Sequence, residues 1–201
     1  NSIIIIPGAN GLVTKELIDE KADIIKESDI VIMQLEIPLD VVEYVKEMAV
    51  RERKTVIVDP APALPDLPDH FWRGIDYVKP NETELAILTG RKLKTREELI
   101  GGARVLIEKG VRNVIVTLGS EGCLMVTEDT EAFFCPYQVK AVDTTAAGDS
   151  FTAAFALALS QGKTCGEAVD LGQKVSSVAV TRKGAQTSIP TMEEVKKMWD
   201  E

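Results

Sequence analysis

The segment AVDTTAAGDSF, residues 141–151, places small residues and a carboxylate between an extended stretch and the apolar sequence FTAAFALAL. If a helix begins near Ala146, the N–H groups of Ala146, Ala147 and Gly148 have no partner in a preceding turn. Together with the helix dipole such groups bind anions, and small side chains leave room for a phosphate to approach. Asp149 could then take a proton from a hydroxyl that attacks this phosphate. A helix cap whose small residues serve only close packing explains the segment equally well.

Other polar residues follow short apolar runs that predict strands. These runs are β-branched and nearly continuous, which is typical of strands buried on both faces. They cover residues 2–6, 30–35, 55–59, 75–79 and 113–119. The polar positions at the ends of extended stretches are Glu36, Asp59, Asn81–Glu84, Thr117–Gly122 and Asp143–Asp149. Because ligands of parallel sheets lie beyond the carboxyl ends of the strands, we expect these positions to share one site.

Helical patterns alternate with the strand-like runs over residues 14–28, 38–54 and 95–110. Thr95 with Glu98 is typical of a capping box, and Gly110 is typical of the end of a helix. Repeated strand–helix–strand units predict an α/β fold, with a mostly parallel central sheet flanked by helices and right-handed crossovers.

The pattern changes after residue 119. An antiparallel hairpin is predicted from residues 122–127 and 131–137, followed by helices at about 147–161, 164–182 and 191–200. The proline-rich residues 59–69 predict a loop, since proline interrupts both kinds of regular structure. No linker composition separates these parts, so residues 1–201 are predicted to form a single domain.

Composition excludes several classes of function. The net charge of −9 disfavours binding to nucleic acid or to an anionic membrane surface. No apolar run approaches a membrane span of roughly 20 residues, and the first residues do not form a signal peptide. Three cysteines without a CxxC pair predict free thiols and a cytoplasmic location. The apolar run at residues 2–6 suggests a strand entered from upstream, so we expect an amino-terminal part to be missing.

Taken together, the motifs resemble the ribokinase-like family of sugar kinases, and within it the ribokinases. VDTTAAGDSF resembles the carboxy-terminal signature of that family, with Ala-Ala-Gly-Asp in the anion loop. The other similar segments, in the same order, are PGAN (7–10), MQLEIP (33–38), DPAPA (59–63), KPNETELAILTG (79–90), VTLGSEG (116–122) and AVTRKGAQTSIP (179–190). The resemblance covers essentially the whole chain and matches the carboxy-terminal two-thirds of the family's fold. It implies that the amino-terminal strands, the lid and most sugar-contacting groups are absent.

The resemblance implies a role for each matching residue. Asp149 would be the general base on the primary hydroxyl of the sugar, and would also contact the substrate. The amides of Ala146, Ala147 and Gly148 would form the anion hole for the transferring phosphoryl group. Glu36 would contact ribose, and Glu84 would organise hydrated Mg²⁺ beside ATP. The nucleotide-binding positions would be Asn81, Thr117, Gly119, Ser120, Gly122 and Gln173.

The resemblance also implies a monovalent cation, usually K⁺, beside the anion loop. The matching positions are Asp143, Thr145, Ala179, Arg182, Gly184 and Ser188, which would contribute mostly backbone carbonyls. Two positions depart from the usual pattern. Gln173 stands where some ribokinases have histidine near the adenine, and Asp59 replaces a frequent asparagine.

The implied activity is ATP-dependent phosphorylation of ribose to ribose 5-phosphate, by a protein expected to be a homodimer when complete. The nucleotide-binding and catalytic part of such an enzyme would then be residues 1–201. Another pentose or a nucleoside is an alternative substrate. A truncated, non-catalytic module that binds nucleotide is an alternative from a different class. A dinucleotide-binding dehydrogenase is disfavoured, because no G-x-G-x-x-G follows an early strand.

Overall fold

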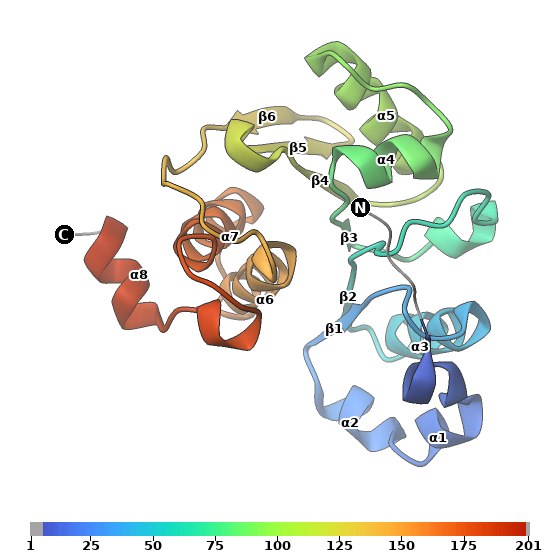
Figure 1. Ribbon diagram of the computed structural model, residues 1–201. Helices are drawn as coiled ribbons and strands as arrows, with labels where there is room; N and C mark the ends of the chain where they lie inside the picture. Colours follow the sequence, from blue (N-terminus) through green and yellow to red (C-terminus); the bar gives the residue numbers. More distant parts are fainter. Residues whose placement is uncertain (1–5, 200–201) are drawn as a thin grey trace. The chain divides into compact units, whose positions relative to one another are not determined.

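Six strands form one sheet, in the order β1-β2-β3-β4-β5-β6, in the computed structural model, which describes residues 6–199 (Figure 1). The strands are β1 (Ile30–Met33), β2 (Thr55–Val58), β3 (Tyr77–Val78), β4 (Asn113–Thr117), β5 (Cys123–Thr127) and β6 (Glu131–Phe134). The first four pair in parallel, with Met33 opposite Val58 and Val78 opposite Val114. The predicted α/β fold with a mostly parallel sheet is therefore confirmed. Residues 2–5 of the predicted strand 2–6 lie outside the described residues.

The chain divides into two compact units. The first holds the chain up to Val114 together with Val126–Asp129, and the second holds Ile115–Met125 and the chain from Thr130 onward. Each unit is described by itself below.

Helix α3 (Leu39–Arg51) carries the main apolar face of the first unit. Its buried residues include Val41, Val42, Val45 and Met48, which recur at helical spacing, and the helix packs against β2. The predicted helix at 38–54 is thus confirmed. Two short helices, α1 (Lys15–Asp19) and α2 (Ala22–Glu27), contact the same helix.

The prediction of one helix over residues 14–28 is wrong, since the chain leaves helical geometry at Lys21, where ψ is 12°. In an unbroken helix Ile24 would point about 120° away from Ile18 and about 100° away from Ile25. The break lets Ile18, Ile24 and Ile25 line one cavity instead. Ile24 nevertheless stays 63% exposed, so the cavity covers only part of its side chain.

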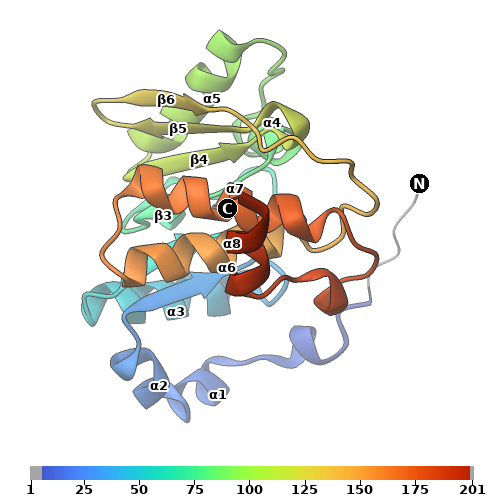
Figure 2. The ribbon, with the colours of Figure 1, turned by 90° about the vertical axis from the view of Figure 1, so that its left-hand side faces the viewer.

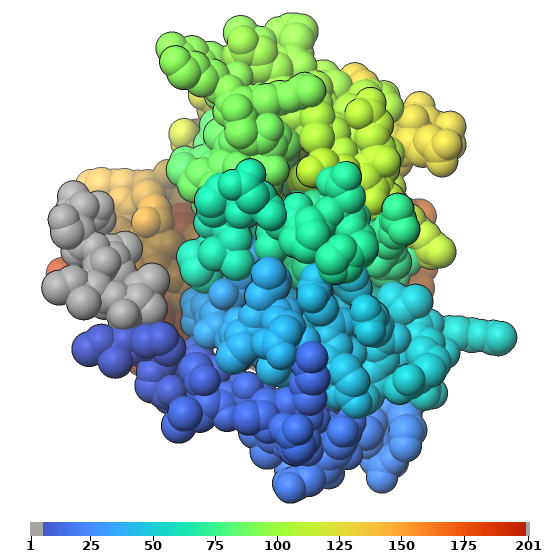
Figure 3. Space-filling view, turned by 90° about the vertical axis from the view of Figure 1, so that its right-hand side faces the viewer, coloured from blue at the N-terminus to red at the C-terminus, as the bar shows by residue number. Residues whose placement is uncertain are grey.

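Two capping boxes fix helices α4 (Glu82–Thr89) and α5 (Arg96–Glu108). The box predicted at Thr95 and Glu98 is confirmed, and Gly110 follows α5 with a φ of +112°. The proline-rich residues 59–68 form the predicted loop and lead into the 3₁₀ helix η2 (Asp69–Trp72). Lys46 of α3 secures η2 by donating to the Phe71 carbonyl at 2.8 Å. Figure 3 shows α3 and the chain that follows it as neighbouring bands of the surface.

Three helices form most of the regular structure of the second unit, namely α6 (Ala147–Ser160), α7 (Cys165–Ala179) and α8 (Met192–Trp199). Figure 2 shows α6 and α7 lying side by side, with α8 beside them. Helix α7 contacts both α6 and α8. Gly172 permits the close approach of α6 and α7, because a Cβ there would lie 3.0 Å from the Phe151 ring. The three predicted helices are confirmed, although the second ends at Ala179, three residues before the predicted end. Asp200, at the end of the third, lies outside the described residues. Strands β5 and β6 are sheet neighbours joined by three residues, a connection that requires an antiparallel pair.

Short 3₁₀ helices occur at η1 (Gly8–Leu12), η3 (Gly119–Glu121) and η4 (Gln186–Ser188). Between residues 6 and 199, none of the helices combines the length and apolar character that crossing a membrane requires. All three cysteines are free thiols, as predicted, with Cys123 buried and Cys135 exposed.

Candidate active site

Ala146 gives the anion loop its shape. It is the N-cap of α6 and adopts left-handed geometry, with φ 61° and ψ 11°. A residue with a Cβ loses about 1 kcal/mol in this geometry, so the surrounding structure must compensate for it. Left-handed residues are common in backbone loops whose amides bind anions, so this geometry is consistent with the predicted anion loop.

The first helical residue is Ala147, as expected for a helix that begins near Ala146. The Ala147 amide donates to the Thr144 carbonyl at 3.3 Å and so closes a turn. Within the described chain, the amides of Ala146 and Gly148 donate to no backbone carbonyl. These two amides are therefore the donors best suited to an anion, while Ala147 shapes the loop. Asp149 is exposed in the first turn of the same helix.

The Asp143 carboxylate organises the predicted cation loops. One oxygen accepts from the Thr145 amide at 3.0 Å, and the other accepts from the Gly184 amide at 3.0 Å. These hydrogen bonds lower the pKa of Asp143 to about 2, the bond from Gly184 having the largest effect. The amides of Val142 and Asp143 also donate to the Val180 carbonyl, at 2.7 and 3.2 Å. The loop before α6 and the loop after α7 thus lie together in the second unit.

Of the remaining predicted cation positions, Ala179 is the last residue of α7, and the others lie in the loop that follows this helix. The Ala179 carbonyl accepts from the Arg182 amide at 3.1 Å, and the Arg182 side chain is paired with Glu194 at 2.8 Å. Ser188 is fully buried, and its hydroxyl donates to the Ala185 carbonyl at 2.7 Å. The two loops that carry these positions are tied together through Asp143, which is compatible with the predicted K⁺ site. The Arg182 side chain would take no direct part.

The predicted nucleotide loop is a tight turn after β4. Leu118 and Gly122 are joined by a hydrogen bond from the Leu118 amide to the Gly122 carbonyl at 2.9 Å. Gly119 and Ser120 are exposed, and Thr117 ends the strand. A Cβ on Gly122 would lie 2.0 Å from the Phe134 carbonyl oxygen, so packing alone requires glycine at that position. The exposed Gly119 and Ser120 are therefore better candidates for a ligand contact than the buried Gly122.

Gln173 lies in α7 and is buried, with its side-chain amide donating to the Cys135 carbonyl at 3.4 Å. This bond links α7 to the segment between β6 and α6. A contact between Gln173 and the nucleotide would therefore either replace the hydrogen bond to the Cys135 carbonyl or use the second N–H of the same side-chain amide.

Asn81 and Glu84 form a reciprocal capping box at the start of α4 in the first unit. The Asn81 side-chain oxygen accepts from the Glu84 amide at 2.8 Å, and Glu84 Oε2 accepts from the Asn81 amide at 2.8 Å. Burial raises the pKa of Glu84, while the bond from Asn81 and the charge of Lys79 oppose that effect. The Asn81 side-chain NH₂ remains suited to donating to a phosphate.

The donors around Glu84 fit Mg²⁺ in a hydrated form. Among residues 6–199 no group of three or more His, Cys, Asp or Glu side chains could enclose a metal ion. Mg²⁺ commonly retains several waters and is held by one or two carboxylates together with substrate phosphates. A single carboxylate such as Glu84 is consistent with that mode of binding.

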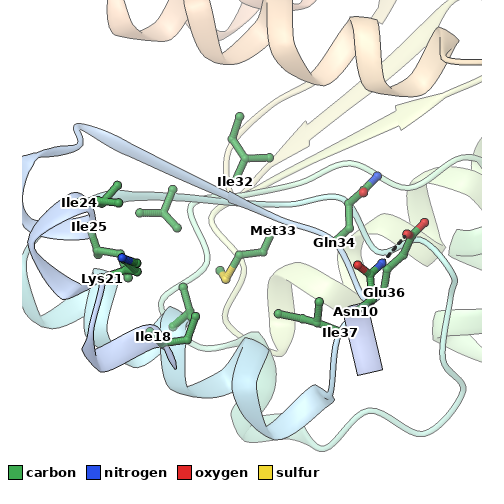
Figure 4. Close-up of a pocket in the computed structure, with 12 residues that line it drawn as sticks. Asn10, Ile18, Lys21, Ile24, Ile25, Ile32, Met33, Gln34, Glu36 and Ile37 are labelled. Carbon is green, nitrogen blue, oxygen red and sulfur yellow. Dashed lines mark hydrogen bonds between the residues drawn. The ribbon is translucent and has the colours of Figure 1, made fainter. Parts of the chain in front are cut away.

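Glu36 lies at one end of a cavity of about 420 Å³ in the first unit. Its carboxylate accepts a long hydrogen bond of 3.5 Å from the Asn10 side chain, as Figure 4 shows. The rest of the lining is mostly apolar and includes Ile18, Ile25 and Met33. The cavity thus has a polar end suited to a hydroxyl group and an apolar remainder.

An ion pair beside the Asn81–Glu84 box was not predicted from the sequence. Lys79 and Asp59 are both buried, and Lys79 Nζ lies 3.1 Å from Asp59 Oδ2. A lysine at the end of an otherwise apolar strand was the available signal, since lysine is rarely buried without a partner.

The chain belongs to the pfkB family of carbohydrate kinases, whose family model matches residues 1–192. It is 38% identical over 194 residues to the ribokinase of Haemophilus influenzae, covering 96% of this chain and 63% of that protein. The deoxyribokinase of Salmonella typhi is also 38% identical, with the same coverage. A solved structure of Arabidopsis thaliana ribokinase complexed with ribose and ATP superposes with a TM-score of 0.92 at 34% identity. That match covers 98% of this chain and 64% of the Arabidopsis chain.

These similarities confirm the resemblance to ribokinases and the ribokinase-like fold expected from the motifs. The chain spans less than two thirds of the length of these relatives.

Proposed function

We propose that this chain carries the nucleotide-binding and catalytic part of an ATP-dependent sugar kinase that phosphorylates ribose. The observation that carries the proposal is the start of α6, where left-handed Ala146 and the exposed Asp149 lie in one loop and the following helical turn. An anion site and a carboxylate on the same turn are what phosphoryl transfer to a hydroxyl requires.

In the proposed reaction the Asp149 carboxylate takes the proton of the sugar's primary hydroxyl. The hydroxyl oxygen attacks the γ-phosphorus of ATP, the bond to the oxygen that bridges the β- and γ-phosphates breaks, and ADP leaves. The amides of Ala146 and Gly148 stabilise the charge on the transferring group. Bound Mg²⁺ would neutralise phosphate charge, and Glu84 would hold its hydration shell. K⁺ held by the loops containing Asp143 and Gly184 would stabilise the anion loop.

Ribose is the proposed substrate because a similar protein is a ribokinase and a similar structure is complexed with ribose and ATP. The equal similarity to a deoxyribokinase makes deoxyribose the second candidate. Glu36, at the polar end of the cavity in the first unit, is the proposed contact to a sugar hydroxyl.

The test is sugar-dependent release of ADP by the protein expressed from its complete reading frame, with ribose and deoxyribose compared at equal concentration. We expect a higher kcat/KM for ribose. A higher kcat/KM for deoxyribose would mean that deoxyribose, not ribose, is the substrate. No release of ADP with any pentose would reject the proposal.

We also propose that residues 1–201 act as one catalytic domain and that the protein works as a homodimer in the cytoplasm. A single thermal unfolding transition would support one domain, and sedimentation at the mass of a dimer would support the homodimer. Cell fractionation tests the cytoplasmic location.

A further inference from the structure

The buried ion pair of Asp59 and Lys79 is the strongest charged feature of the first unit that the proposed mechanism does not use. Only 4% of Asp59 and 5% of Lys79 are exposed, and the two charges lie 3.1 Å apart. Burying two ions costs several kcal/mol per ion before their attraction is counted, and an apolar pair of similar volume is often equally stable. Stability alone therefore gives little reason for the pair.

The backbone fixes both residues at the carboxyl edge of the parallel strands. The Asp59 amide donates to the Met33 carbonyl at 2.8 Å, just beyond β2. The Lys79 amide donates to the Val58 carbonyl at 3.0 Å, just beyond β3. This edge is where parallel sheets bind ligands, so the pair is held rigidly at the functional end of the strands.

The pair also lies close to the Asn81–Glu84 box. One residue, Pro80, separates Lys79 from the Asn81 cap. The Glu84 carboxylate interacts with both charges, since Lys79 favours its ionised form and Asp59 opposes it. The effects of Lys79 and Asp59 on Glu84 are opposite in sign. With the ion pair intact, the net charge of Asp59, Lys79 and Glu84 together is that of the Glu84 carboxylate.

We propose that Asp59 and Lys79 are positioning residues whose balanced charges set how tightly the Asn81–Glu84 site holds a hydrated divalent cation. The proposal rests on the proposed role of Glu84 in Mg²⁺ binding. If Asp59 loses its charge, the remaining Lys79 cation repels a divalent ion. If Lys79 loses its charge, the remaining Asp59 carboxylate attracts one.

The test uses adenylyl imidodiphosphate, an ATP analogue that is not hydrolysed, and measures its affinity by calorimetry with and without Mn²⁺. The ratio of the two affinities gives the cation's contribution and removes direct effects of charge on the nucleotide. We expect Asp59→Asn to lower this ratio and Lys79→Met to raise it, each by about five- to thirtyfold. That range corresponds to about 1–2 kcal/mol, since about 1.4 kcal/mol changes an affinity tenfold.

Asp76→Asn is the matched control. Asp76 is paired with Arg112 at 2.7 Å but precedes β3, so it lies at the opposite, amino-terminal edge of the same strands. This variant removes one carboxylate from an ion pair and should leave the ratio unchanged. If Lys79→Met does not fold, the double variant Asp59→Asn with Lys79→Met should restore the wild-type ratio.

Glu84→Gln distinguishes failure of this proposal from failure of the proposed function. If Glu84→Gln abolishes the Mn²⁺ effect while Asp59→Asn stays within about twofold of wild type, the charge-balance proposal is wrong and the role of Glu84 stands. If Glu84→Gln leaves the ratio unchanged, both are overturned. An equal fall with Asp76→Asn would also overturn the proposal, because the effect would then reflect net charge alone.

Discussion

The Asp143 carboxylate accepts a hydrogen bond from the Gly184 amide at 3.0 Å, although the two residues are 41 positions apart. A second bond, from the Thr145 amide at 3.0 Å, holds the other oxygen of the same carboxylate. One side chain therefore joins the loop before α6 to the loop after α7. Since both loops contribute to the proposed K⁺ site, the geometry of that site depends on Asp143.

The first prediction concerns acid stability. The folded-state pKa of Asp143 is about 2, below its ordinary value of 3.8. A lowered pKa adds stability that is fully present above the ordinary value and is lost as pH falls toward the folded value. Asp143→Ala should therefore unfold at lower denaturant concentration at neutral pH, and the difference from wild type should shrink between pH 3.8 and about 2.

Denaturant unfolding at a series of pH values measures this difference. Asp40→Ala, which alters an exposed acid in the first turn of α3, is the control and should show a smaller effect at neutral pH. A difference that stays constant through the acid window would contradict the assigned role of Asp143.

The second prediction concerns the monovalent cation. Replacing K⁺ by Na⁺ at constant ionic strength should lower the initial rate of the proposed reaction, because a cage of fixed carbonyls suits one ionic radius better. Asp143→Ala should remove most of the difference between the two salts, since its loops are no longer tied. Equal rates of the wild-type protein across full titrations of both salts would argue against a K⁺ site.

The third prediction separates two glycines of the turn after β4. Gly122→Ala should lower the unfolding free energy by about 2–4 kcal/mol, because its Cβ would lie 2.0 Å from a backbone oxygen. A Cβ on Gly119 meets nothing within 4 Å, so Gly119→Ala should cost only about 1 kcal/mol for its φ of +54°. We expect Gly119→Ala to weaken ATP binding instead. Thermal unfolding and ATP titration of both variants check this contrast. An equally small loss of stability in Gly122→Ala and Gly119→Ala would refute it.

The fourth prediction concerns thiol reactivity. Burial raises the pKa of Cys165 to about 11, and Cys123 is buried, whereas Cys135 is exposed. Iodoacetamide should therefore modify Cys135 first, as peptide mass spectrometry would detect. Because the Cys135 carbonyl accepts from Gln173, ATP should slow this reaction if Gln173 contacts the nucleotide. Faster modification of Cys165 would contradict its raised pKa.

Much of the fold could be predicted because local patterns agree with it. The continuous apolar runs became β1, β2 and β4, and the spacing of Thr95 and Glu98 produced the expected capping box. The break in the predicted helix 14–28 could not be foreseen, since it depends on a cavity whose lining also comes from β1 and α3.

The candidate site was predicted as a set of residues rather than as a set of contacts. Small residues before Asp149 indicated an anion loop, but the left-handed geometry of Ala146 is a property of the folded chain. The bond between Asp143 and Gly184 and the pair of Asp59 and Lys79 each join distant parts of the sequence. No local pattern specifies such partners, because tertiary packing decides them.

The most direct test of the central claim is the effect of Asp149→Asn on ribose-dependent ADP formation, with ATP affinity measured on the same preparation. The proposed general base predicts a fall in kcat of ~10²–10⁴-fold. ATP affinity should change little, because the amides of the anion loop remain. Glu167→Gln, which alters an acid in the first turn of α7, should keep near wild-type turnover as a control. Near wild-type turnover of Asp149→Asn would contradict the account.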